Sequence, residues 1–447
     1  AFKNKAATMD EIATELNVNY VVEGSVQIVD YDLRVNVALF DIDKDNTIWS
    51  ETYNNRLEDI LNVQDEIANS IVSKLDEKLT ISRSDLQATE RKATENIEAY
   101  NLIMQAYAYI NNPKYSYKMS GKKAGGLAAE ALKLDSTYAD AYAVSSIAKL
   151  FTWIDTPTYD DPEKEKKEIS DLNKANFLAK TALQYDQDNL LAHTVLICLP
   201  LFNNKSEEFE ANQLLIMRSM LIDAKIFLQK YPDALISEWL YAFILQQKCN
   251  ITGSDKESYK EPLEKMLTIY KKLERNNFVI SHPTEGIVIS SIWGSIAHLY
   301  AMIGEPEKGM DFIIENKQFI CPDGTYECLN VDVLRQIMGG FYNAYYYEKA
   351  LEIIDMVLSQ NEEDLKSSGF SMYHKKIIYH QYGMIHMKWG QYEKAIEGFN
   401  QALNLTFENK TKNQWWNAQF YRRLGLTYIL KGDYITSSKH FKEAVRI

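Results

Sequence analysis

The sequence predicts a mainly α-helical protein in which a helical solenoid follows a small α+β domain with a three-stranded antiparallel sheet. Two observations predict the solenoid: a pattern of glycine, aromatic and alanine residues occurs twice near the carboxyl end, and apolar residues recur at helical spacing from Ile97 onward. A third predicts the sheet, because apolar and polar residues alternate from Leu33 to Leu39. We therefore expect a domain at residues 1–79, a linker at 80–96 and a helical array at 97–447.

The composition excludes several classes of protein. Of the 447 residues, 46% are hydrophobic and 25% are charged, which is an ordinary globular balance. The formal net charge is −13, and we find no basic stripe of the kind that a nucleic-acid surface needs, so we expect no nucleic-acid partner. The longest apolar runs, such as Val195 to Phe202, fall far below the ~20 residues of a membrane-spanning helix, so we expect no membrane segment.

The four cysteines are Cys198, Cys249, Cys321 and Cys328, too few and too scattered for a disulfide scaffold. Reduced thiols fit a cytosol-like compartment, so we expect a cytoplasmic protein. Cys321 and Cys328 are close enough in the sequence to pair or to share a metal, but no histidine or second cysteine pair accompanies them. We interpret them as loop or core residues.

The first elements predict the α+β domain. Thr8 and Glu11 form a capping-box pair that begins a short helix. We expect three strands and then a long amphipathic helix, at Tyr20–Val29, Leu33–Ile42, Thr47–Tyr53 and Leu57–Leu79. Because no initiator methionine precedes Ala1, we expect the domain to be cut at its amino side.

Asp41, Asp43 and Asp45 alternate between the second and third expected strands. They have the spacing of calcium ligands, but an EF-hand loop would need a central glycine and a final glutamate, and Asn46 and Thr52 occupy those places. We therefore interpret the acidic residues as caps of a hairpin turn.

These amino-terminal residues resemble the TolB-like amino-terminal domain of bacterial regulatory proteins. The likeness lies in the segments Leu16–Val26, Arg34–Leu39, Ile48–Tyr53 and Ile60–Ala68. Members of that family usually begin with a further strand and helix that this chain lacks. The resemblance implies a signalling role beside an effector domain, often a class III nucleotide cyclase, a winged-helix DNA-binding domain or a protein kinase. No signature of these effectors occurs in the sequence.

Helical periodicity dominates from Ile97 to the carboxyl end. The expected helices lie at or around Ala99–Ile110, Ala124–Leu134, Ala139–Phe151, Ala175–Ala182, Leu190–Phe202, Glu207–Tyr231, Ala234–Lys248 and Tyr259–Asn276. Residues Trp293 to Gly304 restate the first helix of the repeat, with Gly309 and Ile313 on its partner helix, and residues Leu334 to Ile354 restate the pattern again. Between them we expect a turn at Gly121–Gly126, an exposed insertion at Pro157–Glu168 and a loop at Cys249–Ser258.

The repeated pattern is the most specific signal in the chain. Its two copies are Tyr379-x-x-Tyr382-Gly383-x-x-His386, Gly390-x-Tyr392, Ala395-x-x-x-Phe399-x-x-Ala402 and Tyr421-x-x-Leu424-Gly425-x-x-Tyr428, Gly432-x-Tyr434, Ser437-x-x-x-Phe441-x-x-Ala444. The pattern resembles the tetratricopeptide repeat (TPR), which encodes a helix, a tight turn and an antiparallel second helix. A glycine inside the first helix predicts a close approach to the second helix, and one hairpin needs neighbours to bury its apolar faces.

The TPR resemblance also implies a binding face. In similar proteins the first helix of each hairpin lines the concave side of the array. Mapped onto this chain, that face contains Ser291, His298, Asp332, Arg335, His380, Met384, Met387, Gln419 and Arg422. The lysine and asparagine set with which some TPR proteins clamp a carboxyl terminus is not matched here.

No catalytic or cofactor motif is present. The segment Gly121–Gly126 matches neither a phosphate-binding loop nor a dinucleotide fingerprint. His374, His380 and His386 are spaced by six residues, which points them in three directions around a helix, so they do not converge on a metal. We expect no cofactor, no metal and no enzymatic activity in this chain.

We therefore predict a regulatory scaffold that binds a peptide or protein segment in the concave groove and couples it to an effector domain outside these residues. The alternative is that the chain is the regulatory part of a nucleotide cyclase or of a DNA-binding transcription regulator. The sequence does not predict an oligomeric state.

Overall fold

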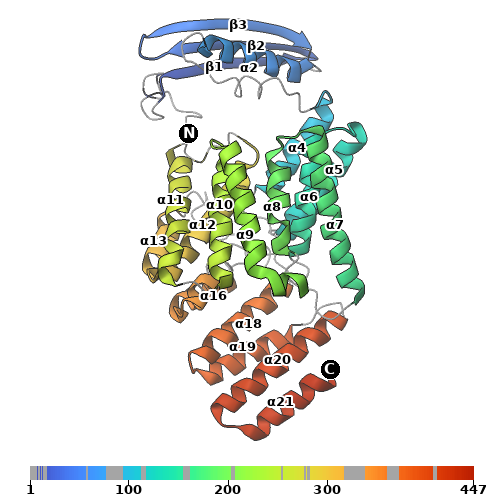
Figure 1. Ribbon diagram of the computed structural model, residues 1–447, viewed down its shortest axis with the longest axis vertical. Coiled ribbons are helices and arrows are strands. Elements are labelled where there is room, and N and C mark those ends of the chain that lie inside the picture. Colours follow the sequence, from blue (N-terminus) through green and yellow to red (C-terminus); the bar gives the residue numbers. More distant parts are fainter. Residues whose placement is uncertain are drawn as a thin grey trace.

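The computed structural model is mainly helical, with one small antiparallel sheet at the end opposite the last helices (Figure 1). It describes residues 8, 11, 13, 18–56, 59–76, 94–111, 117–154, 162–202, 207–252, 255–275, 278, 282–316, 338–359, 372–405 and 410–447. Most of the expected linker at 80–96 therefore lies outside the described residues.

The sheet contains three strands in the order β1-β2-β3, with both neighbouring pairs antiparallel, as predicted. The strands are β1 (Tyr20–Val29), β2 (Asp32–Asp41) and β3 (Asn46–Arg56), and the helix α2 (Ile60–Asp76) packs against them. Leu33, Val35, Val37, Tyr53 and Val63 form their common core. The alternation in β2 therefore places its apolar side chains under α2, because alternate residues of a strand share one face.

The acidic residues after β2 form a hairpin turn, as predicted. Asp41 accepts hydrogen bonds from the backbone nitrogen of Lys44 at 3.2 Å and from its Nζ atom at 2.9 Å. Asp43 accepts a hydrogen bond from Asn19 Nδ2 at 2.8 Å. Asp45 has a φ angle of 45°, in the left-handed region that aspartate tolerates in turns. The carboxylates of Asp41 and Asp43 therefore stabilise the turn through hydrogen bonds.

Helices make up the rest of the described chain, and consecutive helices pack against each other. In order they are α4 (Ile97–Ile110), α5 (Tyr117–Leu134), α6 (Ala139–Ile154), α7 (Pro162–Tyr185), α8 (Leu190–Phe202), α9 (Glu207–Lys230), α10 (Leu235–Thr252), the short 3-10 helix η2 (Lys256–Tyr259), α11 (Lys260–Arg275), α12 (Glu285–Ile303), α13 (Pro306–Glu315), α16 (Tyr347–Leu358), α18 (Met372–Lys388), α19 (Tyr392–Asn404), α20 (Lys410–Lys431) and α21 (Tyr434–Arg446). The predicted helical array is confirmed.

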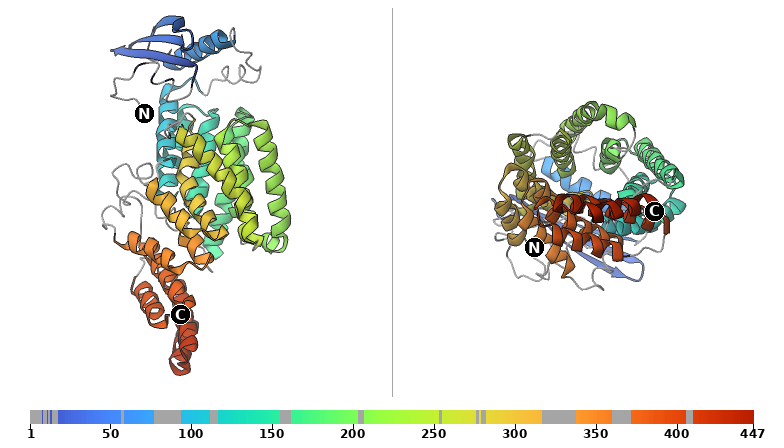
Figure 2. Two further views of the ribbon diagram at one scale, coloured as in Figure 1. Left: turned by 90° about the vertical axis from the view of Figure 1, so that its left-hand side faces the viewer. Right: turned by 90° about the horizontal axis from the view of Figure 1, so that it is seen from below.

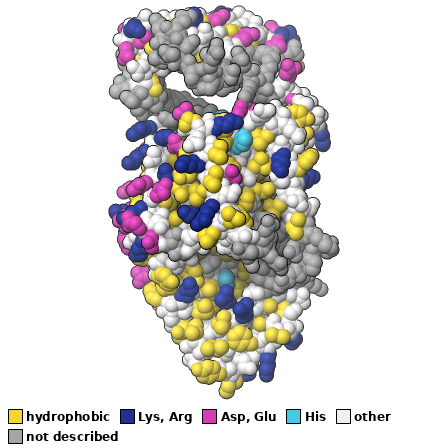
Figure 3. Space-filling view, viewed as in Figure 1, with side chains coloured by type: hydrophobic (Ala, Val, Ile, Leu, Met, Phe, Trp, Pro, Cys, Tyr) yellow, Lys and Arg dark blue, Asp and Glu magenta, His cyan; other side chains and the backbone are white. Residues whose placement is uncertain are grey.

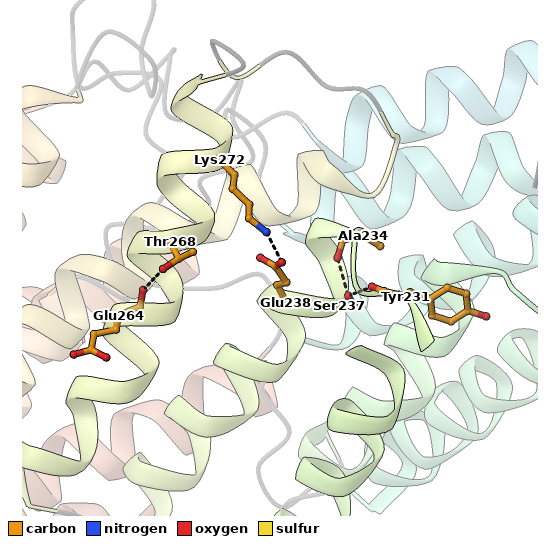
Figure 4. A network of polar contacts seen from close by, with 7 residues as sticks. All are labelled: Tyr231, Ala234, Ser237, Glu238, Glu264, Thr268 and Lys272. Atoms are coloured by element: carbon orange, nitrogen blue, oxygen red, sulfur yellow. Dashed lines mark hydrogen bonds and ion pairs between the residues drawn. The ribbon is translucent and has the colours of Figure 1, made fainter. Parts of the chain in front are cut away.

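Polar contacts join neighbouring helices of the array at their ends. In Figure 4, Lys272 of α11 pairs with Glu238 of α10. At the start of α10, the Ser237 hydroxyl donates to the backbone carbonyl oxygens of Tyr231 and Ala234, at 2.5 Å and 2.7 Å. The two Ser237 contacts satisfy carbonyl groups between the end of α9 and the start of α10, and the Lys272–Glu238 pair joins α10 to α11.

Two predicted connections are wrong. Gly121–Gly126 lies inside α5 instead of forming a turn, and a Cβ atom on Gly121 would come within 2.7 Å of the Ala148 carbonyl oxygen. The glycine therefore permits α5 to approach α6 closely. Of the expected insertion at Pro157–Glu168, residues 162–168 are described and form the start of α7, where proline fits the first turn of a helix. Its exposure stays a prediction. The expected loop after Lys248 begins only after Thr252, where α10 ends.

The helices from α4 to α12 form a curved wall that returns to its own beginning, and we call this part the helical ring (Figure 2). The ring closes where the Asn111 side chain, just after α4, donates a hydrogen bond from Nδ2 to the Pro283 carbonyl oxygen at 2.8 Å. Gly286, in the first turn of α12, lies directly against the Asn111 side chain. A side chain at position 286 would therefore disturb the closure.

The helix α12 is the one described helix whose length and composition would permit it to cross a membrane. In the structure 76% of its apolar window is buried among the other helices. Ile292, Ile296 and Leu299 of this helix are fully buried within the ring. The helix α12 is therefore hydrophobic because it lies in the core of the ring, where other helices cover it.

The last four helices, α18 to α21, extend beyond the ring, and we call them the C-terminal hairpins (Figure 1). Their turns contain Gly390 and Gly432, with φ angles of 79° and 86°, a left-handed conformation that glycine adopts without steric penalty. Ile378 and Ile385 of α18 belong to the core of the ring, whereas Ile377 belongs to a separate core of the hairpins. The helix α18 therefore joins the two cores.

Candidate functional site

The predicted close approach within each C-terminal hairpin is present. A Cβ atom on Gly383 would lie 2.6 Å from Cε1 of Phe399, and one on Gly425 would lie 2.8 Å from Cζ of Phe441. Each glycine of a first helix therefore receives the phenylalanine ring of its second helix. Phe399 is fully buried, which shows how tightly the pair α18–α19 interlocks.

A buried lysine connects α18 to α20. Lys376 is fully buried, and its Nζ atom donates hydrogen bonds to the Leu405 carbonyl oxygen at 2.9 Å and to Asn417 Oδ1 at 3.1 Å. Burial lowers the pKa of the Lys376 ammonium group to about 8, because a low-dielectric environment disfavours its charge. The first helices of the two hairpins therefore lie side by side.

His380, a predicted groove residue, packs among aromatic rings between the two hairpins. Its ring centroid lies 6.0 Å from those of Phe399 and Trp416 and 5.6 Å from that of Phe420. Burial, with a smaller contribution from the charge of Arg423, lowers the pKa of His380 to about 4. A neutral His380 therefore forms part of the packing between α18 and α20 near neutral pH.

The other predicted residues of the hairpins lie on the two first helices. Met384 and Met387 are partly buried against the hydrophobic core of the hairpins. Gln419 is half-buried and Arg422 is exposed on α20. Ile429 continues their helical face and is 41% exposed. We call these five side chains the α18–α20 surface.

The charge of these two helices is uniform. The helix α18 contains three lysines, α20 contains five lysines and arginines, and neither contains an aspartate or a glutamate. Figure 3 shows Lys and Arg side chains beside hydrophobic ones over the lower part of the molecule. Arg422 has no acidic partner among the described residues, whereas Lys431 pairs with Glu393 at 2.7 Å. The sequence prediction missed this feature because the net charge of −13 describes the whole chain; counting charges helix by helix would reveal it.

Two predicted groove residues line a separate cavity inside the helical ring. The cavity has a volume of about 710 Å³, and Ser291 and His298 of α12 lie in its wall. The Ser291 hydroxyl donates to the Ile287 carbonyl oxygen at 3.0 Å, and His298 Nε2 lies 3.3 Å from Asn250 Oδ1. The structure therefore places the predicted residues in two regions: the ring cavity and the C-terminal hairpins.

The cavity wall contains two buried polar atoms that have no hydrogen-bond partner among the described residues. They are the Oε1 atom of Gln246 and the Nε1 atom of Trp239, both in α10. An unpaired buried donor or acceptor costs about 1–3 kcal/mol of stability. Cys198, also in the wall, is a free thiol whose pKa burial raises to about 12, so it remains protonated.

Several predicted residues lie outside the described part of the chain. Asp332 and Arg335 are the two predicted groove residues in this class. Cys321 and Cys328 lie in the same undescribed segment. Their interpretations stay predictions.

No group of three or more histidine, cysteine, aspartate or glutamate side chains that could hold a metal occurs within the described residues. His386 Nδ1 lies 2.8 Å from Gln391 Oε1, while His380 faces α20, so these two histidines diverge as predicted. Burial raises the pKa of Asp140 to about 6, but this carboxylate accepts a hydrogen bond from Asn189 Nδ2 at 2.6 Å. It joins α6 to the start of α8.

Comparison with known proteins identifies the repeat. The family model described as tetratricopeptide repeat matches residues 377–409, which include most of α18 and all of α19. A curated protein of Rhizobium meliloti (strain 1021), named "Putative adenylate cyclase 3", is 30% identical over 199 residues. The aligned part makes up 44% of this chain and 31% of that protein, so this chain spans about a third of the relative's length.

Solved structures that are similar include a tetratricopeptide repeat protein from Parabacteroides merdae ATCC 43184, at 14% identity and a TM-score of 0.35. That match covers 74% of this chain and 99% of the other. The human IFIT1 dimer with PPP-AAAA is 13% identical with a TM-score of 0.39, and the match covers 74% of this chain and 69% of the other. Both TM-scores are too low to indicate a shared whole-chain fold.

Proposed function

We propose that this chain is a protein-interaction scaffold that holds a peptide segment of a partner protein on the α18–α20 surface. The observation that carries the proposal is the charge of the two first helices, which contain eight basic and no acidic residues in a chain of net charge −13. The match of residues 377–409 to a repeat found in interaction proteins supports it.

The chemistry of the surface indicates the kind of segment. Arg422 is exposed and carries the planar guanidinium group that binds a carboxylate through two hydrogen bonds. Met384 and Met387 offer flexible, polarisable side chains that adapt to apolar groups. Ile429 extends the apolar area. The segment that fits best therefore combines acidic and apolar side chains.

The proposed role in the whole protein is regulatory. The relative from Rhizobium meliloti bears the name of a cyclase, and only 31% of its length aligns with this chain. We propose that residues 1–79 form a TolB-like domain, that 80–96 link it to the repeats at 97–447, and that occupancy of the repeats controls an effector elsewhere in the protein. A nucleotide cyclase is the effector that this relative favours, with a DNA-binding regulator as the alternative.

A cytoplasmic location forms part of the same proposal. Cys198 and Cys249, the two cysteines in the described residues, are buried and form no disulfide with each other. Such thiols fit a reducing compartment.

An array of short peptides tests the function. The array presents acidic and basic peptides of equal apolar content, and we expect the full chain to bind the acidic set. Charge reversal in Arg422→Glu should weaken binding about tenfold, because it replaces attraction by repulsion at the surface. The matched control is Lys439→Glu on α21, an exposed residue that carries the same change of charge outside the α18–α20 surface.

Three outcomes would contradict the proposal. The chain would bind neither set of peptides, or the two variants would weaken binding equally, which would indicate only long-range charge effects. In the third outcome a single-stranded oligonucleotide would displace the peptides with a steep dependence on salt, and Arg422→Glu would abolish its binding. That outcome would assign the surface to nucleic acid.

A further inference from the structure

The cavity inside the helical ring has the size of a small-molecule site. Its volume of about 710 Å³ falls within the roughly 300–1,000 Å³ of typical ligand pockets. Its walls come from α5, α6, α8, α9, α10 and α12 and from residues 339 and 343. These elements are distant in the sequence and meet around the cavity because the helices curve into a ring, whose two ends are joined by the hydrogen bond from Asn111 to Pro283.

The wall of this cavity is uncharged. None of the 22 described residues that line it is an aspartate, glutamate, lysine or arginine, although 25% of the chain is charged. Aromatic side chains provide much of the apolar surface, and the rings of Trp239 and Phe243 stack at 5.1 Å with an angle of 13°. A charged ligand would lose its hydration without gaining a counterion, so the wall selects for a neutral one.

Two buried polar atoms in the same wall form no hydrogen bond with the described residues. Gln246 is 5% exposed and its Oε1 atom accepts no hydrogen bond; Trp239 is 6% exposed and its Nε1 atom donates none, among the described residues. Gln246 and Trp239 both line the cavity. A ligand with one N–H or O–H donor and one acceptor would satisfy both atoms. Such a pairing supplies orientation in an otherwise apolar pocket.

We infer that the ring cavity is a binding site for a neutral small molecule that has an aromatic or aliphatic body and a hydrogen-bonding donor and acceptor. This site is separate from the α18–α20 surface, which is basic and belongs to the C-terminal hairpins. The inference therefore does not depend on the peptide proposal. Under this inference the chain has a second ligand, a small molecule bound inside the helical ring.

Two matched fluorescent probes test the inference. N-phenyl-1-naphthylamine is neutral and has one N–H donor, and 1-anilinonaphthalene-8-sulfonate has the same rings with an added sulfonate. Titrated into the full chain, the neutral probe should bind with one-to-one stoichiometry. It should bind about tenfold more tightly than the sulfonate, because the described residues of the cavity wall include no lysine or arginine.

Variants locate the bound probe. Ser291→Phe fills the cavity and should weaken binding of the neutral probe about tenfold. The control Thr268→Phe adds the same ring at an exposed position of α11 and should leave the affinity unchanged. Gln246→Leu removes the unpaired acceptor and should weaken binding about fivefold without lowering the melting temperature, since it removes a buried polar atom that lacks a partner.

The inference fails if the neutral probe shows no saturable one-to-one binding, which would mean that the cavity holds only water. It fails equally if Ser291→Phe and Thr268→Phe reduce affinity to the same extent, or if the sulfonate binds as tightly as the neutral probe. If Ser291→Phe loses its helical circular dichroism, Gln246→Leu decides. If Gln246→Leu binds the neutral probe with unchanged affinity, the inference is overturned.

Discussion

The helical ring and the C-terminal hairpins are built from the same kind of element, paired antiparallel helices, yet they present opposite chemistry. The ring returns on itself and encloses a cavity of about 710 Å³ with no charged residue in its described wall. The hairpins remain open, and their first helices contain only basic charges. Closure and helix-by-helix charge therefore distinguish the two regions, although both are built from paired helices.

The two regions also differ in how their contacts support stability. In the hairpins, each helix packs mainly against its neighbours along the chain. Such an array behaves as a one-dimensional stack whose stability is a sum of local terms. In the ring, the contact between Asn111 and Pro283 joins positions 172 residues apart. Local unfolding of any helix in the ring therefore also weakens the distant contact between Asn111 and Pro283. For this reason we expect the ring to unfold more cooperatively than the hairpins.

The largest expected effect comes from removing the phenylalanine side chain at the centre of the hairpin core. Phe399→Ala deletes a fully buried side chain that interlocks with Gly383, and it should cost about 3–5 kcal/mol of unfolding free energy. Hydrogen exchange followed by mass spectrometry should show faster exchange in α19 to α21 and unchanged exchange in the ring. The control is Phe177→Ala in α7, where the side chain is 66% exposed. Equal acceleration in both regions would contradict the separation of the two cores.

The next largest effect is expected from acid, which should lower the stability of the C-terminal hairpins more than that of the helical ring. The pKa of His380 is about 4 in the folded chain against 6.5 for a free histidine. As the pH falls, the unfolded state therefore binds the proton first, and stability present above pH 6.5 is lost down to pH 4. The hairpins should lose about 3 kcal/mol over this range. Burial also lowers the pKa values of His386 and His440, which acts in the same direction.

Asp140 should oppose this trend in the ring. Its folded pKa of about 6 lies above the usual 3.8, so the folded state binds the proton first and this carboxyl group favours folding of the ring as the pH falls from 6 to 3.8. Burial lowers the pKa of His282, also in the ring, and this group acts in the opposite direction. Pulse proteolysis in urea at pH 7 and pH 4.5, with fragments identified by mass spectrometry, compares the regions. The variant His380→Phe should reduce the acid sensitivity of the hairpins. A ring that loses stability before the hairpins would contradict the assignment.

An intermediate effect is expected from the repeat glycine. Gly383→Val places a branched side chain where a Cβ atom alone would lie 2.6 Å from the Phe399 ring, and overpacking of this kind costs about 1–3 kcal/mol. Gly126→Val in α5 is the matched control, since nothing lies within 4 Å of the place that a Cβ atom would take there. Thermal melts should show a loss for position 383 only. Equal melting temperatures would mean that the glycine is not needed for the approach of α18 to α19.

These comparisons also show which parts of the structure a sequence can predict. The approach of Gly383 to Phe399 and the alternation in β2 depend on residues close together in the chain, so their spacing predicts them. Ring closure depends on Asn111 and Pro283, and no local pattern relates two such distant residues. The error at Gly121 has a similar cause, because its glycine serves contact with α6 and not a turn.

The sequence revealed less of the two candidate sites than of the fold. The mapped residues Ser291 and His298 reached the cavity wall because α12 faces inward, but nothing in their spacing predicted a closed space around them. Gln246 and Trp239 were missed because an unpaired polar atom is a property of three-dimensional surroundings. The basic character of α20 was available from the sequence and was hidden by averaging over the chain.

The smallest expected effect tests the closure of the ring itself. Asn111→Ala removes the hydrogen bond to Pro283, a loss of about 0.5–1.5 kcal/mol. Hydrogen exchange should quicken at the end of α4 and at the start of α12, with the C-terminal hairpins unchanged. The control Asn250→Ala removes a carboxamide from the cavity wall, away from the closure. If Asn111→Ala leaves exchange in both α4 and α12 as it was, the ring is held shut by packing alone, and its cooperativity would not depend on this hydrogen bond.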